Sequence, residues 1–261
     1  NGATGTSYIL SAVTGDANGT YRCVVSNTFG TAISNGAVLT TRLPNNLSEF
    51  TGGLIGYYPF NGNANDESGN DYHGTVYGAT LAMDRNGTNA KAYSFDGVND
   101  RLTVELDTSP LMQFNDQNSF TLNFWMKRVD SAASTYVITY YGKEPSVPAH
   151  LTTELDFFEF DSSLVAGQLG GRMGKAYTGT DPLPARTAIP ADTWVDVTYV
   201  YDGNVYTMYL NGESVSSVTK SQAVGSVKSL GRVTVGNYGN GYSNYYSGTV
   251  DDIRIYNRAL S

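Results

Sequence analysis

Short stretches of alternating apolar and polar residues, separated by turn-forming residues, follow one another along most of this chain. No segment keeps the 3.6-residue apolar period of a helix, and only residues 257–261 hint at a helical turn. The motifs Asp202-Gly203-Asn204 and Asn211-Gly212 are typical of hairpin turns. We predict strands at residues 54–60, 90–96, 101–106, 119–128, 134–141, 151–160, 194–201, 204–210, 231–236 and 246–256. This pattern predicts an all-β fold, an antiparallel two-sheet sandwich or jelly roll.

Two of these stretches show which side chains should enter the core. In residues 119–127 one face carries Phe120, Leu122, Phe124 and Met126, and the other carries Thr121, Asn123, Trp125 and Lys127. In residues 194–201, Val195 and Tyr199 share a face, and Trp194 has the opposite parity. Both tryptophans therefore lie on faces with polar neighbours. Such a face is either a ligand platform or a surface covered by a loop or a second layer.

The overall charge excludes some classes of partner. The 16 basic and 24 acidic residues give a net charge of −8 and a pI near 4.7. A nucleic-acid-binding protein would be expected to carry a basic surface, so this charge argues against that function. The same charge disfavours docking on anionic lipid, and no apolar run approaches the ~20 residues of a membrane span. The 20 tyrosines suit a surface that meets sugars, and equally a plain β-sandwich.

Residues 1–42 form a separate region, in which we expect strands at 6–14, 19–27 and 31–41. Tyr21 stands two residues before Cys23, which resembles the corner tyrosine and second cysteine of an immunoglobulin-like domain, here only strands E to G. Cys23, the only cysteine, then has no disulfide partner and belongs in the core, and the chain is a piece of a longer protein. A generic β-meander is the alternative. Residues 43–53, which contain Pro44, read as a linker before a second domain at 54–261.

Four segments of that second domain resemble a known family, in the right order. They are Gly53–Asn70, Ala92–Leu102, Ser119–Met126 and Gly248–Ser261. Together they are similar to the LamG-like and pentraxin-like jelly rolls of the concanavalin A-like lectin/glucanase superfamily. The resemblance implies a jelly roll over residues 54–261. The stretch 143–190 matches no pattern that we can place.

Asp251 is the first candidate for a metal ligand. It has the parity of Ile253 and Ile255 in the last predicted strand, so it should point inward. A buried carboxylate is costly without a cation or hydrogen-bond donors. Its partner is therefore a metal ion or, alternatively, Arg254 or backbone amides.

The loop at residues 61–71 is rich in Asn and Asp, the hard oxygen ligands that suit calcium. The family resemblance implies a structural calcium that ties this loop to the last strand. Asp66 and Asp251 would then be side-chain ligands, and Asn63 and His73 would offer backbone or amide oxygens. Solvated turn residues are the alternative.

A third group of acids raises the question of catalysis. Glu154, Asp156 and Glu159 fit the pattern E-x-D-x-x-E, which resembles the catalytic strand of retaining glucanases, agarases and carrageenases of the same superfamily. There the first Glu is the nucleophile and the last is the acid/base, on one cleft. In a regular strand Glu159 points away from Glu154, so a β-bulge would be needed. The alternative is that all three are surface acids.

A tyrosine-rich stretch precedes the last strand and should be an exposed loop. Aromatic rings stack on the C–H faces of sugars, which makes its tyrosines candidates for glycan contact. The candidates are Tyr238, Tyr242, Tyr245 and Tyr246, with Trp125 as a further one. Alternatively, Tyr245 or Tyr246 begins the strand and packs.

Three functions compete. The first is a non-catalytic module that binds a glycan or a surface glycoprotein, with a structural calcium. The second is a structural or adhesive spacer within a larger surface protein, and the third is a glycoside hydrolase that uses Glu154 and Glu159. We expect the parent protein to be bacterial and secreted or on the cell surface, with neighbouring domains and no membrane insertion.

Overall fold

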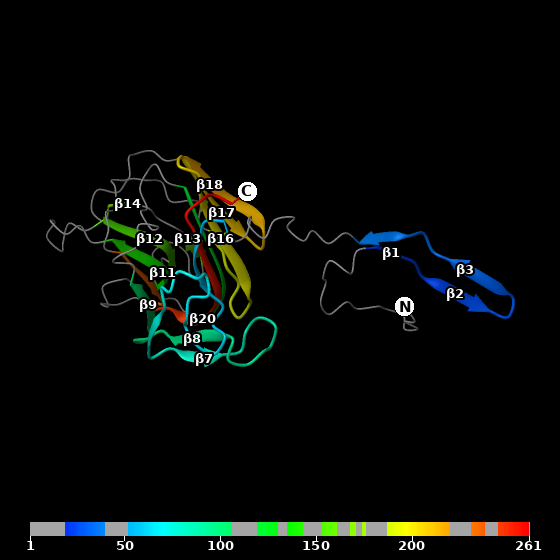
Figure 1. Ribbon diagram of the computed structural model, residues 1–261, viewed down its shortest axis with the longest axis horizontal. Coiled ribbons are helices and arrows are strands. Elements are labelled where there is room, and N and C mark those ends of the chain that lie inside the picture. The colour runs from blue at the N-terminus through cyan, green and yellow to red at the C-terminus, as the bar shows by residue number, and fades with distance from the viewer. Residues whose placement is uncertain are drawn as a thin grey trace. The chain divides into compact units, whose positions relative to one another are not determined.

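The computed structural model covers the chain in two compact units, residues 1–52 and 53–261. It describes residues 19–39, 52–105, 119–129, 135–142, 153–160, 168–170, 174–175, 187–219, 231–237 and 245–260. These residues form strands, turns and loops, with no helix among them, so none of them forms a helix that could cross a membrane. The all-β class predicted from the sequence is confirmed (Figure 1).

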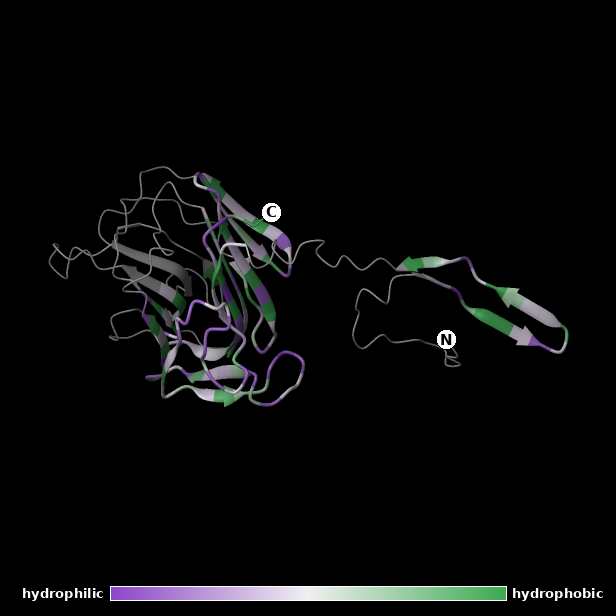
Figure 2. Ribbon diagram, viewed as in Figure 1, coloured by the Kyte–Doolittle hydropathy of each residue, from purple (hydrophilic) through white to green (hydrophobic). Residues whose placement is uncertain are grey.

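The N-terminal unit contains two small antiparallel ribbons. β1 (Gly19–Tyr21) pairs with β4 (Ala37–Leu39), and β2 (Val24–Asn27) pairs with β3 (Gly30–Ile33). The hydrophobic residues of these strands, green in Figure 2, are largely exposed, and the Phe29 side chain at the β2–β3 turn is 96% exposed. Cys23 is exposed as well, so its predicted place in a core is wrong for the described residues. The immunoglobulin-like assignment stays a prediction.

The second unit contains two sheets whose strand pairs are all antiparallel. The first sheet has the order β18-β17-β16-β10-β20-β8-β7, and β5 also pairs with β20. Its strands are β5 (Leu54–Tyr58), β7 (Thr80–Ala82), β8 (Ala92–Asp96), β10 (Phe120–Arg128), β16 (Val195–Tyr201), β17 (Val205–Leu210), β18 (Glu213–Thr219) and β20 (Ser247–Tyr256).

The second sheet has the order β15-β13-β12-β11-β19-β9-β6, and β14 also pairs with β12. Its strands are β6 (Thr75–Tyr77), β9 (Arg101–Glu105), β11 (Thr135–Gly142), β12 (Thr153–Phe160), β13 (Gln168–Gly170), β14 (Gly174–Lys175), β15 (Thr187–Ala188) and β19 (Gly231–Val235). The ten strands predicted from alternation are all present, with ends that differ by at most two residues.

The core lies between the two sheets. The β10 residues predicted to face inward, Phe120 and the alternate apolar residues after it, are buried, and so are Val195, Val197, Tyr199 and Tyr201 of β16. The rings of Tyr201 and Tyr206 stack with centroids 4.4 Å apart. We call the side of the first sheet that turns away from this core the outer face.

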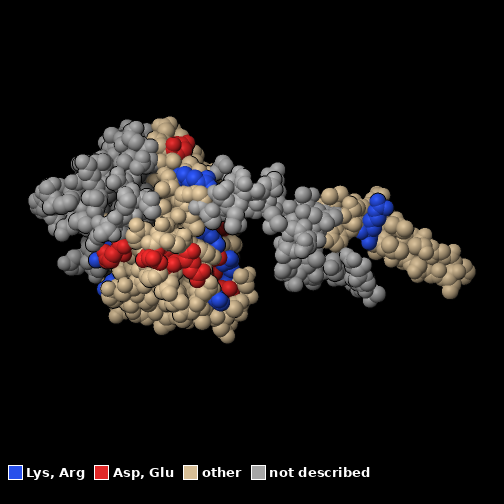
Figure 3. Space-filling view, viewed as in Figure 1, with Lys and Arg blue, Asp and Glu red and all other residues tan. Residues whose placement is uncertain are grey.

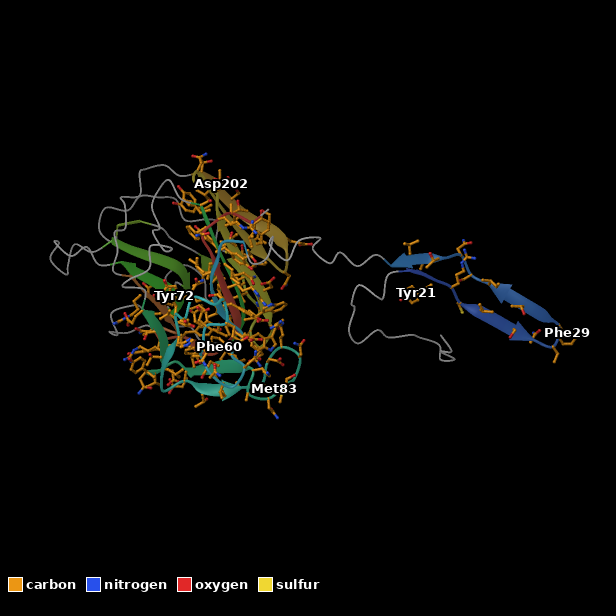
Figure 4. The ribbon with its side chains drawn as sticks, viewed as in Figure 1. Tyr21, Phe29, Phe60, Tyr72, Met83 and Asp202 are labelled. Atoms are coloured by element: carbon orange, nitrogen blue, oxygen red, sulfur yellow. The ribbon has the colours of Figure 1, made fainter. Side chains whose placement is uncertain are left out.

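The two predicted hairpin turns are confirmed. At the β16–β17 turn, labelled in Figure 4, the Asp202 carboxylate accepts hydrogen bonds from the backbone N–H groups of Asn204 (2.8 Å) and Val205 (2.7 Å). At the β17–β18 turn, Asn211 and Gly212 both have positive φ, 51° and 81°, as this type of tight hairpin requires.

Gly236 lies at the end of β19, where the backbone has φ +87° and the ring of Phe95 approaches closely. A Cβ atom there would lie 2.4 Å from a Phe95 ring carbon, whereas Gly87, with φ +80°, has nothing within 4 Å. We expect Gly87→Ala to lower the free energy of unfolding by about 1 kcal/mol through φ strain, and Gly236→Ala by about 2 to 4 kcal/mol through strain plus overpacking. Urea unfolding of the two variants measures the difference, and equal losses would contradict the packing described for Gly236.

Candidate functional site

A β-bulge in β20 determines which side chains meet on the outer face. In the pairing with β10, Asn123 is opposite Arg254 and Trp125 is opposite Asp251, so β20 has one extra residue between these two pairs. Asp252 is part of this bulge and has φ 52°. Asp251 therefore shares the outer face with Trp125, and the inward orientation predicted for it from parity is wrong.

The other neighbour of Trp125 is Asp196 on β16. Asp196, Trp125 and Asp251 thus form a row across three adjacent strands, which we call the tryptophan row. Since neighbouring strands lie ~4.8 Å apart, the backbones of the two aspartates are about 10 Å apart, with the indole between them. The prediction that Trp125 lies on a polar face is confirmed, and its side chain is half-buried.

One end of this row is filled by a network of charged groups, which we call the arginine network. It consists of Arg85, Asp251, Asp252, Arg254 and Tyr57. The two terminal nitrogens of Arg85 each lie 2.6 Å from a carboxylate oxygen, one on Asp251 and the other on Asp252. Asp252 also lies 3.2 Å from a terminal nitrogen of Arg254 and accepts a hydrogen bond from the Tyr57 hydroxyl (3.2 Å).

Both arginines of the network also lie over aromatic rings. The guanidinium carbon of Arg85 is 4.9 Å from the centroid of Trp125, and that of Arg254 is 4.7 Å from the centroid of Tyr57. These distances lie within the range of cation–π attraction. The two contacts join the charged groups to the aromatic side chains of the face.

Arg85 reaches the network from the loop between β7 and β8, which begins at Met83 (Figures 1 and 4). The Asp84 carboxylate holds this loop in a tight turn, because it accepts hydrogen bonds from the backbone N–H groups of Asn86 (2.8 Å) and Thr88 (2.7 Å). The loop thereby brings Arg85 to the last strand, 166 residues away in the chain.

The two aspartates of the tryptophan row both resist ionisation. Burial raises the pKa of Asp251 to about 6, and the charge of Asp252 adds to this, although Arg85 opposes it. Burial also raises the pKa of Asp196, against a hydrogen bond from the Asn123 amide (2.5 Å) and the more distant charges of Arg254 and Arg85. The two carboxyl groups thus differ in environment. Asp251 is ion-paired with Arg85, and Asp196 forms no ion pair with any residue that the structure describes.

The loop expected to bind calcium is organised by Asp66. Its carboxylate accepts hydrogen bonds from the backbone N–H groups of Tyr57 (2.9 Å), Ser68 (2.9 Å) and Tyr72 (3.2 Å), and from the Ser68 hydroxyl (2.9 Å). The Asp66 N–H donates to Nδ1 of His73 (3.1 Å). These contacts explain why the Asn/Asp-rich segment folds into this loop.

The four predicted calcium ligands take part in hydrogen bonds and an ion pair within the described residues. Asn63 accepts a hydrogen bond from the backbone N–H of Asn65 (2.8 Å). Asp251, which was predicted to share an ion with Asp66, forms an ion pair with Arg85. In the described ranges, no group of three or more His, Cys, Asp or Glu side chains is placed to hold a metal ion. The ion-pair partner of Asp251 is Arg85, and Arg254, the partner considered from the sequence, pairs with Asp252 instead. Calcium binding itself stays a prediction.

The structure separates the candidate tyrosines. Tyr246 is only 1% exposed, and its ring packs at 6.2 Å from that of Phe95, so its predicted role as a sugar platform is wrong because it belongs to the core. Tyr245 is half-buried. Tyr238 and Tyr242 lie outside the described residues, and their role stays a prediction.

The three acids of the E-x-D-x-x-E motif lie on β12, of which the structure describes the backbone. The pairing of β12 with β11 shifts register on both sides of Ile138, an irregularity of the kind that the catalytic alternative requires. The structure does not describe the side chains of Glu154, Asp156 and Glu159, so their roles stay predictions.

The sequence pattern does not predict most of the arginine network. Arg85 carried no signal, because its partners are distant in the chain. The pair Asp251-Asp252 did carry one: aspartate tolerates positive φ better than most residues, and two adjacent acids in an otherwise alternating strand can mark a bulge.

The family described as "Concanavalin A-like lectin/glucanases superfamily" matches residues 95–261. No curated protein matches the sequence. Among solved structures, domain 4 of AbnA, an extracellular GH43 arabinanase from Geobacillus stearothermophilus crystallised with arabinotriose, is 19% identical with a TM-score of 0.51, over 80% of this chain and 94% of that one.

Two larger proteins are also similar in structure. The binding domain of Paraclostridial Mosquitocidal Protein 1 is 17% identical, with a TM-score of 0.55, over 81% of this chain and 50% of that one. Trypanosoma rangeli sialidase is 16% identical, with a TM-score of 0.57, over 87% of this chain and 32% of that one. The chain thus spans half or less of these two proteins, and at these identities the likeness shows the fold alone.

The raised pKa of Asp251 gives a test of the arginine network. A carboxyl group with a higher pKa in the folded state than in the unfolded chain contributes stability that is present at low pH and is lost as the pH rises through about 6. We expect the melting temperature of the wild-type protein, relative to Asp251→Asn, to be higher at about pH 4.5 than at about pH 7.5. Asp71→Asn, an exposed site, is the control. A difference between wild type and Asp251→Asn that does not change with pH would contradict the burial of Asp251.

Proposed function

The chain belongs to the concanavalin A-like lectin/glucanase superfamily, and on this basis we propose that its jelly-roll unit binds carbohydrate without cleaving it. The observation that supports this most is the outer face of the first sheet, which carries both tryptophans of the chain beside carboxyl groups, with Asp196 on the strand next to Trp125. Sugar recognition commonly combines an aromatic ring with polar groups that hydrogen-bond to hydroxyls. The arabinanase domain, which has a similar fold, was solved in complex with arabinotriose.

Binding is favoured over hydrolysis by the state of the carboxyl groups on this face. A retaining glycosidase needs two free carboxyl groups about 5 Å apart, and an inverting one needs them about 6.5 to 9.5 Å apart. Asp251 and Asp252 are adjacent in the chain and both bind Arg85, which places a guanidinium against the carboxylate oxygens that a glycosidase would direct at the sugar. Hydrolysis by Glu154 and Glu159 on β12 remains the catalytic alternative.

We further propose that the module works outside the cell, as part of a larger secreted or cell-surface protein, where it attaches its parent to a glycan or a surface glycoprotein. The similar structures include a domain of an extracellular arabinanase and the binding domain of a mosquitocidal protein. A spacer without a ligand is the competing proposal for the same location.

A structural calcium stays part of the proposal because of the family resemblance alone. An ion that binds only the folded form would raise the melting temperature as its free concentration rises, with the logarithm of that concentration once it exceeds the dissociation constant. Melting with calcium and with a chelator measures this. No response would remove calcium from the proposal, and the loop would then be held by hydrogen bonds, those of Asp66 and of the Asn70 amide among them.

The proposed function predicts weak binding to a glycan without turnover. In a panel of neutral and acidic polysaccharides that includes arabinan, we expect at least one neutral member to bind with a dissociation constant of roughly micromolar to millimolar, and no release of reducing sugar. Asp196→Ala should weaken this binding at least about tenfold, the effect of losing ~1.4 kcal/mol. Tyr77→Ala is the matched control, because Tyr77 is a 43% exposed aromatic residue on the second sheet.

Two outcomes would contradict the proposal. If no glycan binds the wild-type protein, the spacer function replaces it. If reducing sugar appears and its release is abolished by Glu154→Gln, the protein is a hydrolase.

A further inference from the structure

The outer face has a filled half and an open half. In the filled half, the side chains of the arginine network already bind one another. Arg85 lies 2.6 Å from a carboxylate oxygen of each of two aspartates, and its guanidinium carbon is 4.9 Å from the Trp125 centroid. A sugar stacked on that side of the Trp125 ring would have to displace Arg85 from both carboxylates. Trp125 therefore marks the edge of the available surface.

The open half lies toward the start of β16 and contains Trp194, Lys127 and Asp196. Trp194 directly precedes β16 and has the parity of Asp196, which places it on the outer face. The Lys127 ammonium lies over one face of the Trp194 ring, 5.4 Å from its centroid. Unlike Arg85, it is held there by no carboxylate of the described residues, so a sugar that stacks on this face would move Lys127 without breaking an ion pair. All three side chains are half-exposed.

Two polar groups of the open half have bonding capacity to spare. The Asn123 amide donates to Oδ1 of Asp196, and Oδ2 accepts no hydrogen bond from any described residue. The Lys127 ammonium forms no ion pair within the part of the chain that the structure describes. The open half thus offers an acceptor, a cationic donor and an aromatic face within two residues of one another along paired strands.

We propose that the ligand binds in this open half, stacked on Trp194, and that it is a neutral glycan. This inference rests on the proposed function and adds the position and the class of ligand. The Asp196 carboxylate would accept hydrogen bonds from sugar hydroxyls, and Lys127 would donate to a hydroxyl or ring oxygen.

Charge selects a neutral ligand. An acidic sugar near Asp196 would meet like charge, and an amino sugar would meet Lys127. The basic groups in and beside this face, Lys127, Arg85 and Arg254, nearly balance the acidic ones, Asp84, Asp196, Asp251 and Asp252. Figure 3 also shows acidic side chains in a band across the visible side of this unit, which would repel acidic polysaccharides at a distance.

The presence of only two tryptophans in the chain allows a direct test. Trp125→Phe leaves Trp194 as the sole indole, and Trp194→Phe leaves Trp125. Each variant is titrated with a neutral oligosaccharide that binds the wild-type protein, and its tryptophan fluorescence is measured. We expect the emission maximum of Trp125→Phe to shift until binding is saturated, and that of Trp194→Phe to stay unchanged. The reverse pattern would place the ligand in the filled half and overturn the inference.

Affinity measurements complete the test. We expect Trp194→Ala to weaken binding at least about tenfold. Arg85→Ala should lower the melting temperature, because it leaves buried carboxylates unpaired, but should change the dissociation constant less than about twofold below that temperature. Binding to a neutral ligand should also change little between about 50 and 500 mM salt, since no net charge is neutralised.

The experiments distinguish a wrong binding position from a wrong proposed function. If the wild-type protein binds a glycan and Trp194→Ala binds it equally well, only the position in the open half is wrong. If Trp194→Ala fails to fold, the emission of Trp125→Phe still decides the position. Tighter binding of an acidic than of a neutral glycan would overturn the ligand class.

Discussion

The outer face depends on the pairing of β10 with β20 across the bulge at Asp252. Without the extra residue, the alternation of β20 would turn Asp251 toward the core, where a carboxylate has no partner. With it, Asp251 stands beside Trp125 and meets Arg85, while Val250, Ile253 and Ile255 on either side still point into the core. One left-handed residue thus reconciles a buried apolar strand with a charged pair on its other face.

The fold could be predicted from the sequence because most strands of this unit are long and regular in their alternation. The missed strands are of two kinds. Five of them, β6, β7, β13, β14 and β15, have only two or three residues, too few for a period. In β18 (Glu213–Thr219) the only apolar residues are Val215 and Val218, which do not alternate regularly. Short or polar edge strands form because a neighbour is already in place, which a local pattern cannot show.

The site could be predicted only in part, for a related reason. Trp125 was identified because alternation applies within β10. Arg85 could not be identified, because its contacts come from a loop that meets β20 only in the folded protein. For Tyr246 the sequence left two possibilities, an exposed loop or packing at the start of the strand, because the residues around it look like a loop. The second is correct, and a backbone hydrogen bond from the Tyr246 N–H to the Gly236 carbonyl (2.9 Å) helps to hold it in the core.

The place of β20 in the first sheet has a consequence for the order in which the unit folds. This strand comes last among the described strands, yet it pairs with β10, β8 and β5, which are made much earlier. Until β20 leaves the ribosome, β10 and β8 lack the strand that joins them, and their unpaired edges are open to other chains. The jelly roll can therefore close only after its synthesis is nearly complete, and a nascent chain that stalls before Ser247 is exposed to aggregation.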